Sequence, residues 1–381
     1  MESLGIAVFF AATAMLAYSL AGYPMLIAAL GKLAPRPIRK QPLEKTVSIL
    51  LPVRNGEPWI RAKLESLLAL AYPRHLVTII VVSDGSQDRS DEIAAEYAGQ
   101  GVRLERIASG GKAAALNRAM ERAEGEILFF TDVRQPVDPD CLARLVACFA
   151  DPEVGVATGE LTILDGDTRE QAHIGLYWKY EKWIRRQLNR AGSLLVVTGC
   201  VYAMRRSLAG PLPPGTLIDD AVLPARALLK GHRIVFEEAA RAYDYPTALD
   251  AEFRRKVRTL AGLFQLARLC PRLLNPFHGA GFHFLSYKFS RLVMPYALLA
   301  ALASAPFLPR PWNYWCAGIQ AAFYALAAAD PAVPERSPLK WASSIARTFT
   351  ILMLASLCAA AVLFVPPERL WKQAQAGSPK P

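Results

Sequence analysis

The sequence predicts an α/β domain with a mostly parallel, Rossmann-like sheet and flanking helices, joined to transmembrane helices at both ends. Between Thr46 and Thr131, short runs of β-branched residues alternate with helical patterns, which is typical of βαβ units. Four long uncharged runs near the chain ends have about the length needed to cross a bilayer. Composition agrees: 53% of the 381 residues are hydrophobic and only 20% are charged, whereas soluble proteins carry about a quarter charged residues.

The first uncharged run, Ser3–Gly31, contains 29 residues and predicts a retained membrane anchor over residues 1–35. A cleavable signal peptide has a basic start and a shorter apolar run, whereas this chain begins Met1-Glu2. One acid, Glu44, follows the run against five basic side chains: Lys32, Arg36, Arg39, Lys40 and Lys45. By the positive-inside rule, the next domain should be cytoplasmic. We therefore expect a multi-pass protein of the cell inner membrane.

Residues 36–287 form the expected cytoplasmic domain, and its first half has the clearest pattern. The strands are expected at Val47–Val53, Val77–Ser83, Val102–Ile107 and Glu126–Thr131. The helices are expected at Glu57–Leu70, Asp88–Gly99 and Lys112–Ala123. Ligands bind outside the carboxyl ends of the strands in such sheets. Three segments are therefore candidates for a site: Pro52–Glu57, Ser83–Ser86 and Asp132–Arg134.

The second half of this domain is more mixed. Two basic and aromatic helices, at about 168–188 and 250–269, bracket short strands and a helix that begins near Asp219. Basic residues interleaved with Tyr and Trp also suit stacking on RNA. Because these helices lie next to predicted spans, we interpret them as interfacial, and no nucleic-acid partner is expected. The net charge of +11 then fits an anionic membrane face or a phosphorylated substrate.

Residues 288–381 are expected to form C-terminal transmembrane helices and a tail. Three uncharged runs predict the helices: Leu292–Pro309, Pro311–Ala329 and Thr348–Pro367. Four spans in total would place the tail outside, yet the tail carries Arg369 and Lys372. One run is therefore expected to lie in the interface or to re-enter, and the number of spans stays open.

Carboxylates follow two of the predicted strands. Asp84 comes directly after a hydrophobic strand in VVSDGSQD, and Asp132 ends another in ILFFTDVRQ. Asp84 is placed to accept a hydrogen bond from a base or ribose, and Asp132 to ligate a divalent cation that carries a diphosphate. The plainer alternative for each is a turn or a helix cap. The Asp219-Asp220 pair has a similar alternative as an N-cap pair, because helix N-termini favour acids.

Several other site types lack their motifs. No G-x-G-x-x-G follows a strand, no G-x-S-x-G is present, and Arg106 stands where a Walker loop ending at Lys112 requires glycine. The six cysteines contain no C-x-x-C pair, so neither a zinc site nor a disulfide framework is indicated. The carboxylates at the strand ends remain the main candidates.

Seven motifs occur in order along the chain: LPVRNGE, VVSDGSQD, GGKAAALNRAM, FFTDVRQ, TGCVYAMRR, LIDDAVLP and RRKVRT. Each is weak alone, but their order and spacing are specific. Over about Thr46–Leu269, and in its flanking spans, the chain resembles the family 2 glycosyltransferases of inverting GT-A fold. The resemblance is to the membrane-embedded branch that includes cellulose, hyaluronan and poly-N-acetylglucosamine synthases.

The resemblance implies nucleotide-sugar binding by eight residues: Pro52, Asn55, Glu57, Asp84, Lys112, Asn117, Asp132 and Arg258. The first three would frame the uridine pocket. Asp84 would bind uracil or ribose, Lys112 would lie near the nucleotide and sugar in a loop ordered by Asn117, and Arg258 would hold the diphosphate.

The remaining matches imply the chemistry. Asp132 matches the first acid of the D-x-D motif, which implies Mg²⁺ or Mn²⁺. The turn Thr198-Gly199-Cys200 matches the segment under the acceptor. Asp220 matches the catalytic base of the T-E-D motif.

Two positions depart from the family pattern. Arg134 replaces the second D-x-D acid, so metal binding would depend on Asp132, and the arginine itself could offset diphosphate charge. The Q-x-x-R-W motif reads Arg255 to Thr259, without the Gln and without the Trp that stacks on the polymer in processive synthases. This loss favours a single transfer or few transfers.

We therefore expect a membrane-bound inverting glycosyltransferase that uses a nucleotide sugar, a UDP-hexose or UDP-N-acetylhexosamine. The acceptor would be a saccharide or lipid-linked glycan of cell-surface polysaccharide synthesis, with other polysaccharide-assembly subunits as possible partners. Two alternatives stay open: a non-catalytic nucleotide-binding membrane scaffold, supported by Arg134, and a transferase to polyprenyl phosphate.

Overall fold

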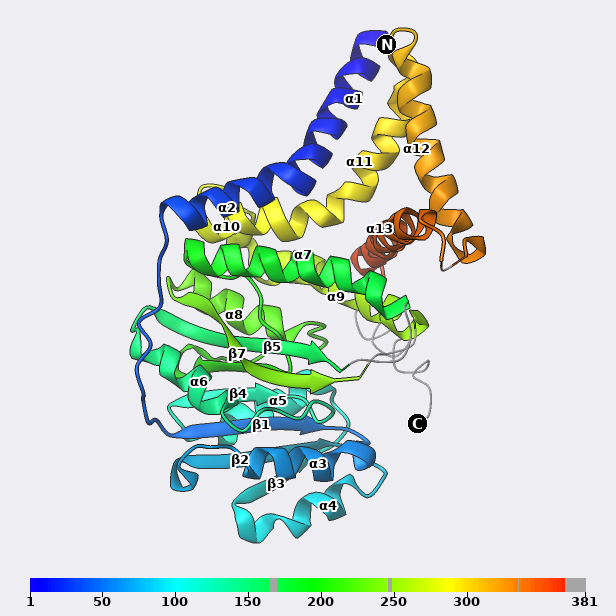
Figure 1. Ribbon diagram of the computed structural model, residues 1–381. Helices are drawn as coiled ribbons and strands as arrows, with labels where there is room; N and C mark the ends of the chain where they lie inside the picture. The colour runs from blue at the N-terminus through cyan, green and yellow to red at the C-terminus, as the bar shows by residue number, and fades with distance from the viewer. Residues whose placement is uncertain (165–169, 246–248, 335, 367–381) are drawn as a thin grey trace.

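A seven-stranded sheet forms the centre of the computed structural model, which describes residues 1–164, 170–245, 249–334 and 336–366 (Figure 1). The strands follow the order β3-β2-β1-β4-β6-β5-β7. Their bounds are β1 Val47–Val53, β2 Val77–Asp84, β3 Val102–Ile107, β4 Ile127–Thr131, β5 Val154–Ile163, β6 Val201–Arg205 and β7 Arg233–Asp244. The predicted α/β fold with a mostly parallel sheet is confirmed.

The four strands expected from the sequence form the parallel half of the sheet. Strand β1 pairs in parallel with both β2 and β4, and β2 pairs in parallel with β3. Leu50 and Leu128 pack into the core on one face, and Ile49 and Phe129 pack into the core on the other. Because both faces are covered, β1, β2 and β4 are nearly continuous hydrophobic runs, whereas the edge strand β3 also carries charged residues. Their predicted bounds therefore agree with the observed ones to within one residue.

The other half of the sheet contains the antiparallel strand β6, which lies between β4 and β5. Strand β7 pairs in parallel with β5 and forms the edge. In the register of β4 and β6, Thr131 lies opposite Val201. The first residue of β6 is therefore beside the last residue of β4, and the turn that precedes β6 reaches the carboxyl end of β4.

Helices cover both faces of the sheet. One face packs against α3 (Glu57–Leu68), α4 (Ser90–Glu96) and α6 (Cys141–Ala147). The other packs against α5 (Lys112–Arg122), α7 (Glu170–Ala191), α8 (Asp219–Leu229) and α9 (Leu249–Leu269). Helices α7 and α9 also lie between the sheet and the apolar helices at the chain ends (Figure 1). This is the position expected of the two basic and aromatic helices.

Several basic residues of α7 pair with acids of the protein. Lys182 pairs with Glu160 of β5, and Arg186 pairs with Glu238 of β7 at 2.7 Å. In the same helix, Glu181 accepts a hydrogen bond from the Tyr287 hydroxyl at 2.7 Å. These contacts fasten α7 to the sheet on one side and to the apolar helices on the other. Lys182 and Arg186 therefore bind acids of the sheet rather than lipid. An interfacial role of α7 would depend on its other residues.

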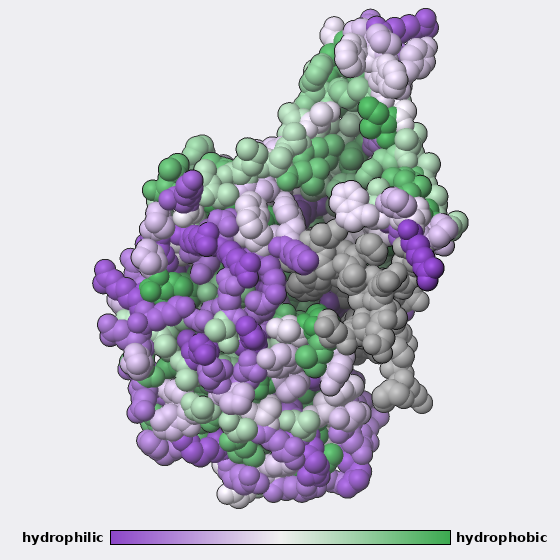
Figure 2. All heavy atoms as spheres, in the orientation of Figure 1, coloured by the Kyte–Doolittle hydropathy of each residue, from purple (hydrophilic) through white to green (hydrophobic). Residues whose placement is uncertain are grey.

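Apolar helices cover the side of the sheet domain formed by α7 and α9. They are α1 (Glu2–Ala17), α2 (Tyr23–Leu33), α10 (Gly279–His283), α11 (Ser290–Ser304), α12 (Trp312–Ala329) and α13 (Leu339–Ala359). Three of them, α1, α11 and α12, extend away from the sheet domain as a largely hydrophobic projection (Figures 1 and 2). In the described part of the chain, three continuous helices are long and apolar enough to cross a membrane: Glu2–Leu33, Gly279–Phe307 and Leu339–Leu363. The fourth uncharged run, 311–329, forms α12 and is not among them.

Candidate active site

Three segments that are distant in the sequence meet at Lys112. Its Nζ lies 2.9 Å from Oδ1 of Asp132 and 3.2 Å from Oδ1 of Asp219. Lys112 begins α5, Asp132 follows β4 and Asp219 begins α8. Burial acts to lower the pKa of Lys112, but the charges of Asp132, Asp219 and Asp220 outweigh burial and raise it. Lys112 is therefore a fixed positive charge among three acids.

Asp220 carries a carboxyl group with a raised pKa. The pair Asp219-Asp220 lies in the first turn of α8, whose N-cap is Ile218, and no side-chain cap bond is formed. The pair is therefore not an N-cap pair, although the helix dipole favours its negative charge. Burial and the charge of Asp219 raise the pKa of Asp220 to about 7, against the opposing charges of Lys112 and Arg258. A carboxyl that titrates near neutral pH is suited to proton abstraction.

The turn at residues 198–200 lies directly against Asp220. A Cβ built on Gly199 would lie 2.7 Å from Oδ2 of Asp220, so only glycine leaves room for this carboxylate. The turn is fixed by the Thr198 backbone N–H, which donates to the Thr158 hydroxyl at 2.9 Å. Arg185 of α7 donates to the Thr198 hydroxyl at 2.9 Å. The segment matched to the acceptor turn therefore borders the candidate base.

Replacing Gly199 by Ala should impair turnover more than stability. The added methyl group would displace the Asp220 carboxylate, and small misplacements of a reacting group cost about 100-fold in rate. Steady-state kinetics and thermal unfolding should therefore show a large fall in kcat with a modest fall in Tm. Gly99→Ala is the matched control, because a Cβ there meets no atom within 4 Å. Equal kcat values for the two variants would contradict the assigned geometry.

Arg258 and Asn117 lie on helices that border the acidic cluster. Burial lowers the pKa of Arg258, while the charges of Asp220, Asp219 and Asp132 act to raise it, so the guanidinium faces these acids. Asn117 of α5 forms two bonds with the loop before α8: its amide donates to the Leu212 carbonyl at 2.9 Å, and its Oδ1 accepts from the Leu212 N–H at 2.7 Å. Asn117 thus orders the loop that leads to Asp219.

Asp84 organises the loop that carries Lys112. Its side chain is buried at the end of β2 and accepts the backbone N–H groups of Gly110, at 2.6 Å, and Gly111, at 3.0 Å. Arg54 lies 3.7 Å from the same carboxylate. The carboxylate thus fixes the start of α5. Its expected contact with uracil or ribose stays a prediction.

The loops after β1 and β2 are joined by Asn55 and Glu57. Asn55 has φ 50°, a left-handed conformation that Asn tolerates well, and its Oδ1 accepts from the Gln87 N–H at 2.9 Å. Glu57 accepts from the Arg89 N–H at 3.1 Å. The two loops therefore form one wall beyond the strand ends. Pro52 is still part of β1, and the wall is formed by residues that follow the strand.

Arg134 is paired with an acid that the sequence did not single out. Its Nη2 lies 2.5 Å from Oδ2 of Asp244, the last residue of β7, and the Gln135 amide donates to the same oxygen at 2.8 Å. Asp244 is buried. Arg134 therefore has a carboxylate partner at the sheet edge.

The acids present fit a divalent cation only in part. Among the described residues, no group of three or more His, Cys, Asp or Glu side chains is arranged to hold a metal ion. Asp132 has a partly exposed carboxylate in the D-x-D position, and Lys112 contacts one of its oxygens. This donor set fits a cation that takes one protein carboxylate and completes its shell with phosphate and water oxygens.

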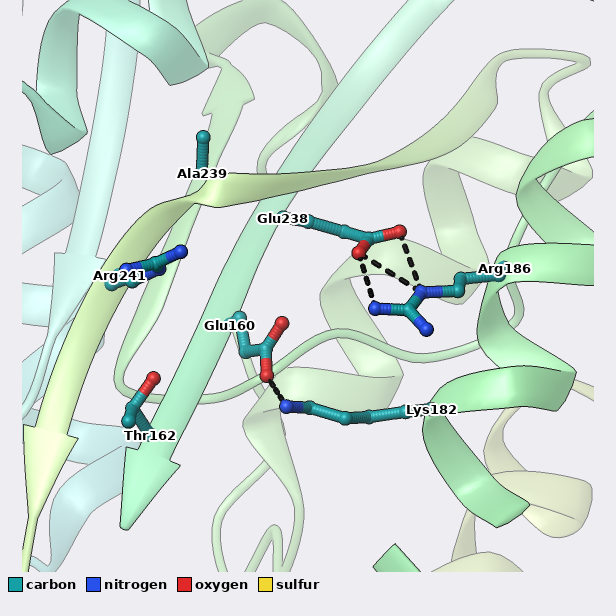
Figure 3. Close-up of a pocket in the computed structure, with 7 residues that line it drawn as sticks. All are labelled: Glu160, Thr162, Lys182, Arg186, Glu238, Ala239 and Arg241. Atoms are coloured by element: carbon teal, nitrogen blue, oxygen red, sulfur yellow. Dashed lines mark hydrogen bonds and ion pairs between the residues drawn. The ribbon is translucent and has the colours of Figure 1, made fainter. Parts of the chain in front are cut away.

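A separate pocket lies between α7 and strands β5 and β7 (Figure 3). Its charged lining includes the pairs Lys182–Glu160 and Arg186–Glu238 described above. None of the residues predicted for the site lines it. We assign it no part in the chemistry.

Comparisons with known proteins identify the family and the fold. Glycosyl transferase family 2 matches residues 48–210, and Glycosyl transferase family group 2 matches residues 134–365, more than half of the chain. The probable glycosyltransferase YdaM of Bacillus subtilis is 25% identical over 229 residues, which are 57% of this chain and 54% of that protein. An N-acetylglucosaminyltransferase of Rhizobium meliloti is 26% identical over 292 residues, 71% of this chain and 68% of that protein. The match to the Bacillus protein thus spans about half of its length.

A solved structure has the same fold along nearly the whole chain. It is the mannosyltransferase PcManGT from Pyrobaculum calidifontis in complex with GDP-Man and Mn²⁺. The TM-score is 0.70 at 23% sequence identity, covering 98% of this chain and 99% of that one. This likeness establishes the GT-A fold.

Proposed function

Because the chain belongs to glycosyltransferase family 2 and is a glycosyltransferase, we propose that it is a membrane-bound inverting enzyme. It moves a sugar from a UDP-hexose or UDP-N-acetylhexosamine to a glycan or lipid-linked acceptor in cell-surface polysaccharide synthesis. The sheet domain works at the cytoplasmic face of the inner membrane. The observation that carries this proposal is the convergence of Asp132, Asp219 and Asp220 on Lys112 beyond the carboxyl end of β4.

The charges of this cluster suit cleavage of a sugar–diphosphate bond. The leaving nucleoside diphosphate gains negative charge as the bond breaks, and Lys112 and Arg258 are the cations placed to stabilise that charge. Asp132, when it shares Mg²⁺ or Mn²⁺ with the diphosphate, would add further charge neutralisation. The Mn²⁺ named for the structurally similar mannosyltransferase supports this part of the proposal.

Asp220 is the proposed base. The acceptor hydroxyl is a weak nucleophile, and Asp220 takes its proton as the oxygen attacks the anomeric carbon. Attack on the face opposite the leaving diphosphate inverts the anomeric centre. The turn at residues 198–200 borders Asp220, so an acceptor resting on it would present its hydroxyl to the carboxylate.

The membrane placement is supported by the three helices that are long and apolar enough to span. They join the sheet domain through α7 and α9 (Figure 1), so the sheet domain would lie close to the bilayer surface. A lipid-linked acceptor could reach a site in that domain without leaving the membrane.

A donor screen tests the proposal directly. The detergent-solubilised full chain is heated with a panel of UDP- and GDP-sugars, with and without Mn²⁺, and sugar transfer is then measured with the donors that raise Tm. A donor present at 100 times its Kd should add about 2.7 kcal/mol to stability. We expect a UDP-sugar to give the largest shift and to be turned over, with free sugar as the inactive control. No shift and no turnover with any nucleotide sugar would refute the proposed function, and turnover of GDP-sugars alone would refute the choice of donor.

A further inference from the structure

Lys63 of α3 carries a buried ammonium group that is held by two neutral acceptors. Its residue is 1% exposed, and its Nζ donates to the Thr131 hydroxyl at 2.6 Å and to the Gln135 carbonyl at 2.5 Å. No carboxylate of the described chain lies within ion-pairing distance of this ammonium. Burial lowers the pKa of Lys63 to about 8. Removing a charge from water is costly unless it is paired, so packing alone does not account for a lysine here.

The two acceptors of Lys63 are the ends of the loop that carries Asp132. Thr131 ends β4, and Gln135 follows four residues later. By binding a side chain at one end and a carbonyl at the other, the ammonium closes residues 131–135 into a fixed bend. The buried Thr131 hydroxyl also donates to the Cys200 carbonyl at 2.8 Å.

The same hydrogen bonds therefore connect both halves of the candidate site. On one side of Thr131 the chain continues directly to Asp132. On the other, Cys200 is next to Gly199, whose backbone lies against the Asp220 carboxylate. A change in the Lys63–Thr131 contact would alter the position of Asp132 relative to Asp220.

We propose that Lys63 is a positioning residue. Its ammonium and the Thr131 hydroxyl hold the 131–135 loop and the 198–200 turn at the separation that lets Asp132 serve the donor diphosphate while Asp220 faces the acceptor hydroxyl. The inference rests on the proposed function of these two acids and assigns Lys63 no contact with substrate. This role cannot be predicted from the sequence, because a lysine in the middle of a helix is ordinarily a solvated residue.

The test compares four variants of the full chain by steady-state kinetics and thermal unfolding. Lys63→Met keeps an unbranched side chain of similar length and removes the charge. Thr131→Val removes the hydroxyl at constant shape, whereas Thr131→Ser keeps it. Arg205→Met is the matched control, because Arg205 also donates to backbone carbonyls, those of Val154 and Phe149, but at the opposite end of the β4–β6 pair.

We expect Lys63→Met and Thr131→Val to lower kcat/KM for the donor by about 10- to 100-fold, the cost of a misplaced reacting group. Thr131→Ser should restore most of the activity. Arg205→Met should lower Tm without lowering kcat/KM at temperatures well below its Tm. If Lys63→Met does not fold, the comparison of Thr131→Val with Thr131→Ser decides the question.

Equal losses in Thr131→Val and Thr131→Ser would overturn the positioning role. So would a kcat/KM of Lys63→Met equal to that of Arg205→Met. In both cases the wild-type chain would still turn over its donor, so the proposed function would stand. A wild-type chain that binds and turns over no nucleotide sugar would overturn both proposals.

Discussion

Replacing Asp220 by Asn should abolish sugar transfer and leave nucleotide-sugar binding almost unchanged. The amide keeps the shape of the side chain but cannot accept the acceptor's proton, and a general base contributes about 10²- to 10⁴-fold to rate. In the proposed mechanism, donor binding depends instead on Lys112, Arg258 and Asp132, which the substitution leaves in place. The measurement is kcat for transfer together with donor Kd by calorimetry.

The matched control for this variant is Asp91→Asn. Asp91 pairs with Arg106 at 2.6 Å on the surface of α4 and β3, and it is not a predicted site residue. The control should keep both kcat and Kd. If Asp220→Asn weakens donor binding as much as it weakens turnover, Asp220 is a donor-binding residue and another group must be the base.

Replacing Lys112 by Met should have the second largest effect, and it should also change the pH dependence. Loss of one charge that stabilises the leaving group costs about 10²- to 10³-fold in kcat. The pKa of Asp220 is raised to about 7, and Asp220 acts in its deprotonated form, so wild-type kcat/KM should fall as the pH drops below about 7. The positive charge of Lys112 acts to lower the pKa of Asp220. Without Lys112 this pKa should be higher, so the acidic limb of the pH profile, where kcat/KM falls with decreasing pH, should move to higher pH.

Lys45→Met serves as the control for Lys112→Met. Lys45 pairs with Glu126 at 2.8 Å near the amino ends of β1 and β4, far along the strands from the acids. Its kcat and pH profile should match those of the wild-type protein. Because the acids titrate together, the apparent pKa measured from the acidic limb of the pH profile is a property of the cluster rather than of Asp220 alone. An acidic limb that stays in place, or moves to lower pH, in Lys112→Met would contradict the assigned electrostatics.

The parallel half of the fold could be predicted because its signal is local. Strands such as Val47–Val53 are buried on both faces and bounded by loops, so hydrophobic runs mark their ends directly. The antiparallel strand Val201–Arg205 gave no comparable signal. Its direction and its place between β4 and β5 depend on pairing with segments more than 40 residues away in the chain.

The sequence predicts which residues make up the candidate site, but it does not predict which of them are in contact. Asp132, Lys112 and Asp220 are predicted from their positions after strands and in motifs, and Lys112 does contact Asp132. The sequence assigns no role to Asp219, which the structure also pairs with Lys112. The motif could not indicate that Asp84 binds the Gly110 and Gly111 N–H groups, because this bond joins two separate loops.

Hydrophobic periodicity and motif order are properties of the chain, so the fold class, the apolar segments and the chemical types of the site residues could be predicted without coordinates. Which charges are neighbours depends on tertiary packing. Packing pairs Arg134 with Asp244 of the sheet edge. It also places the Lys63 ammonium on two neutral acceptors at the ends of the loop of Asp132. Electrostatic energy depends on distance and burial, and both are fixed only when the strands and helices pack.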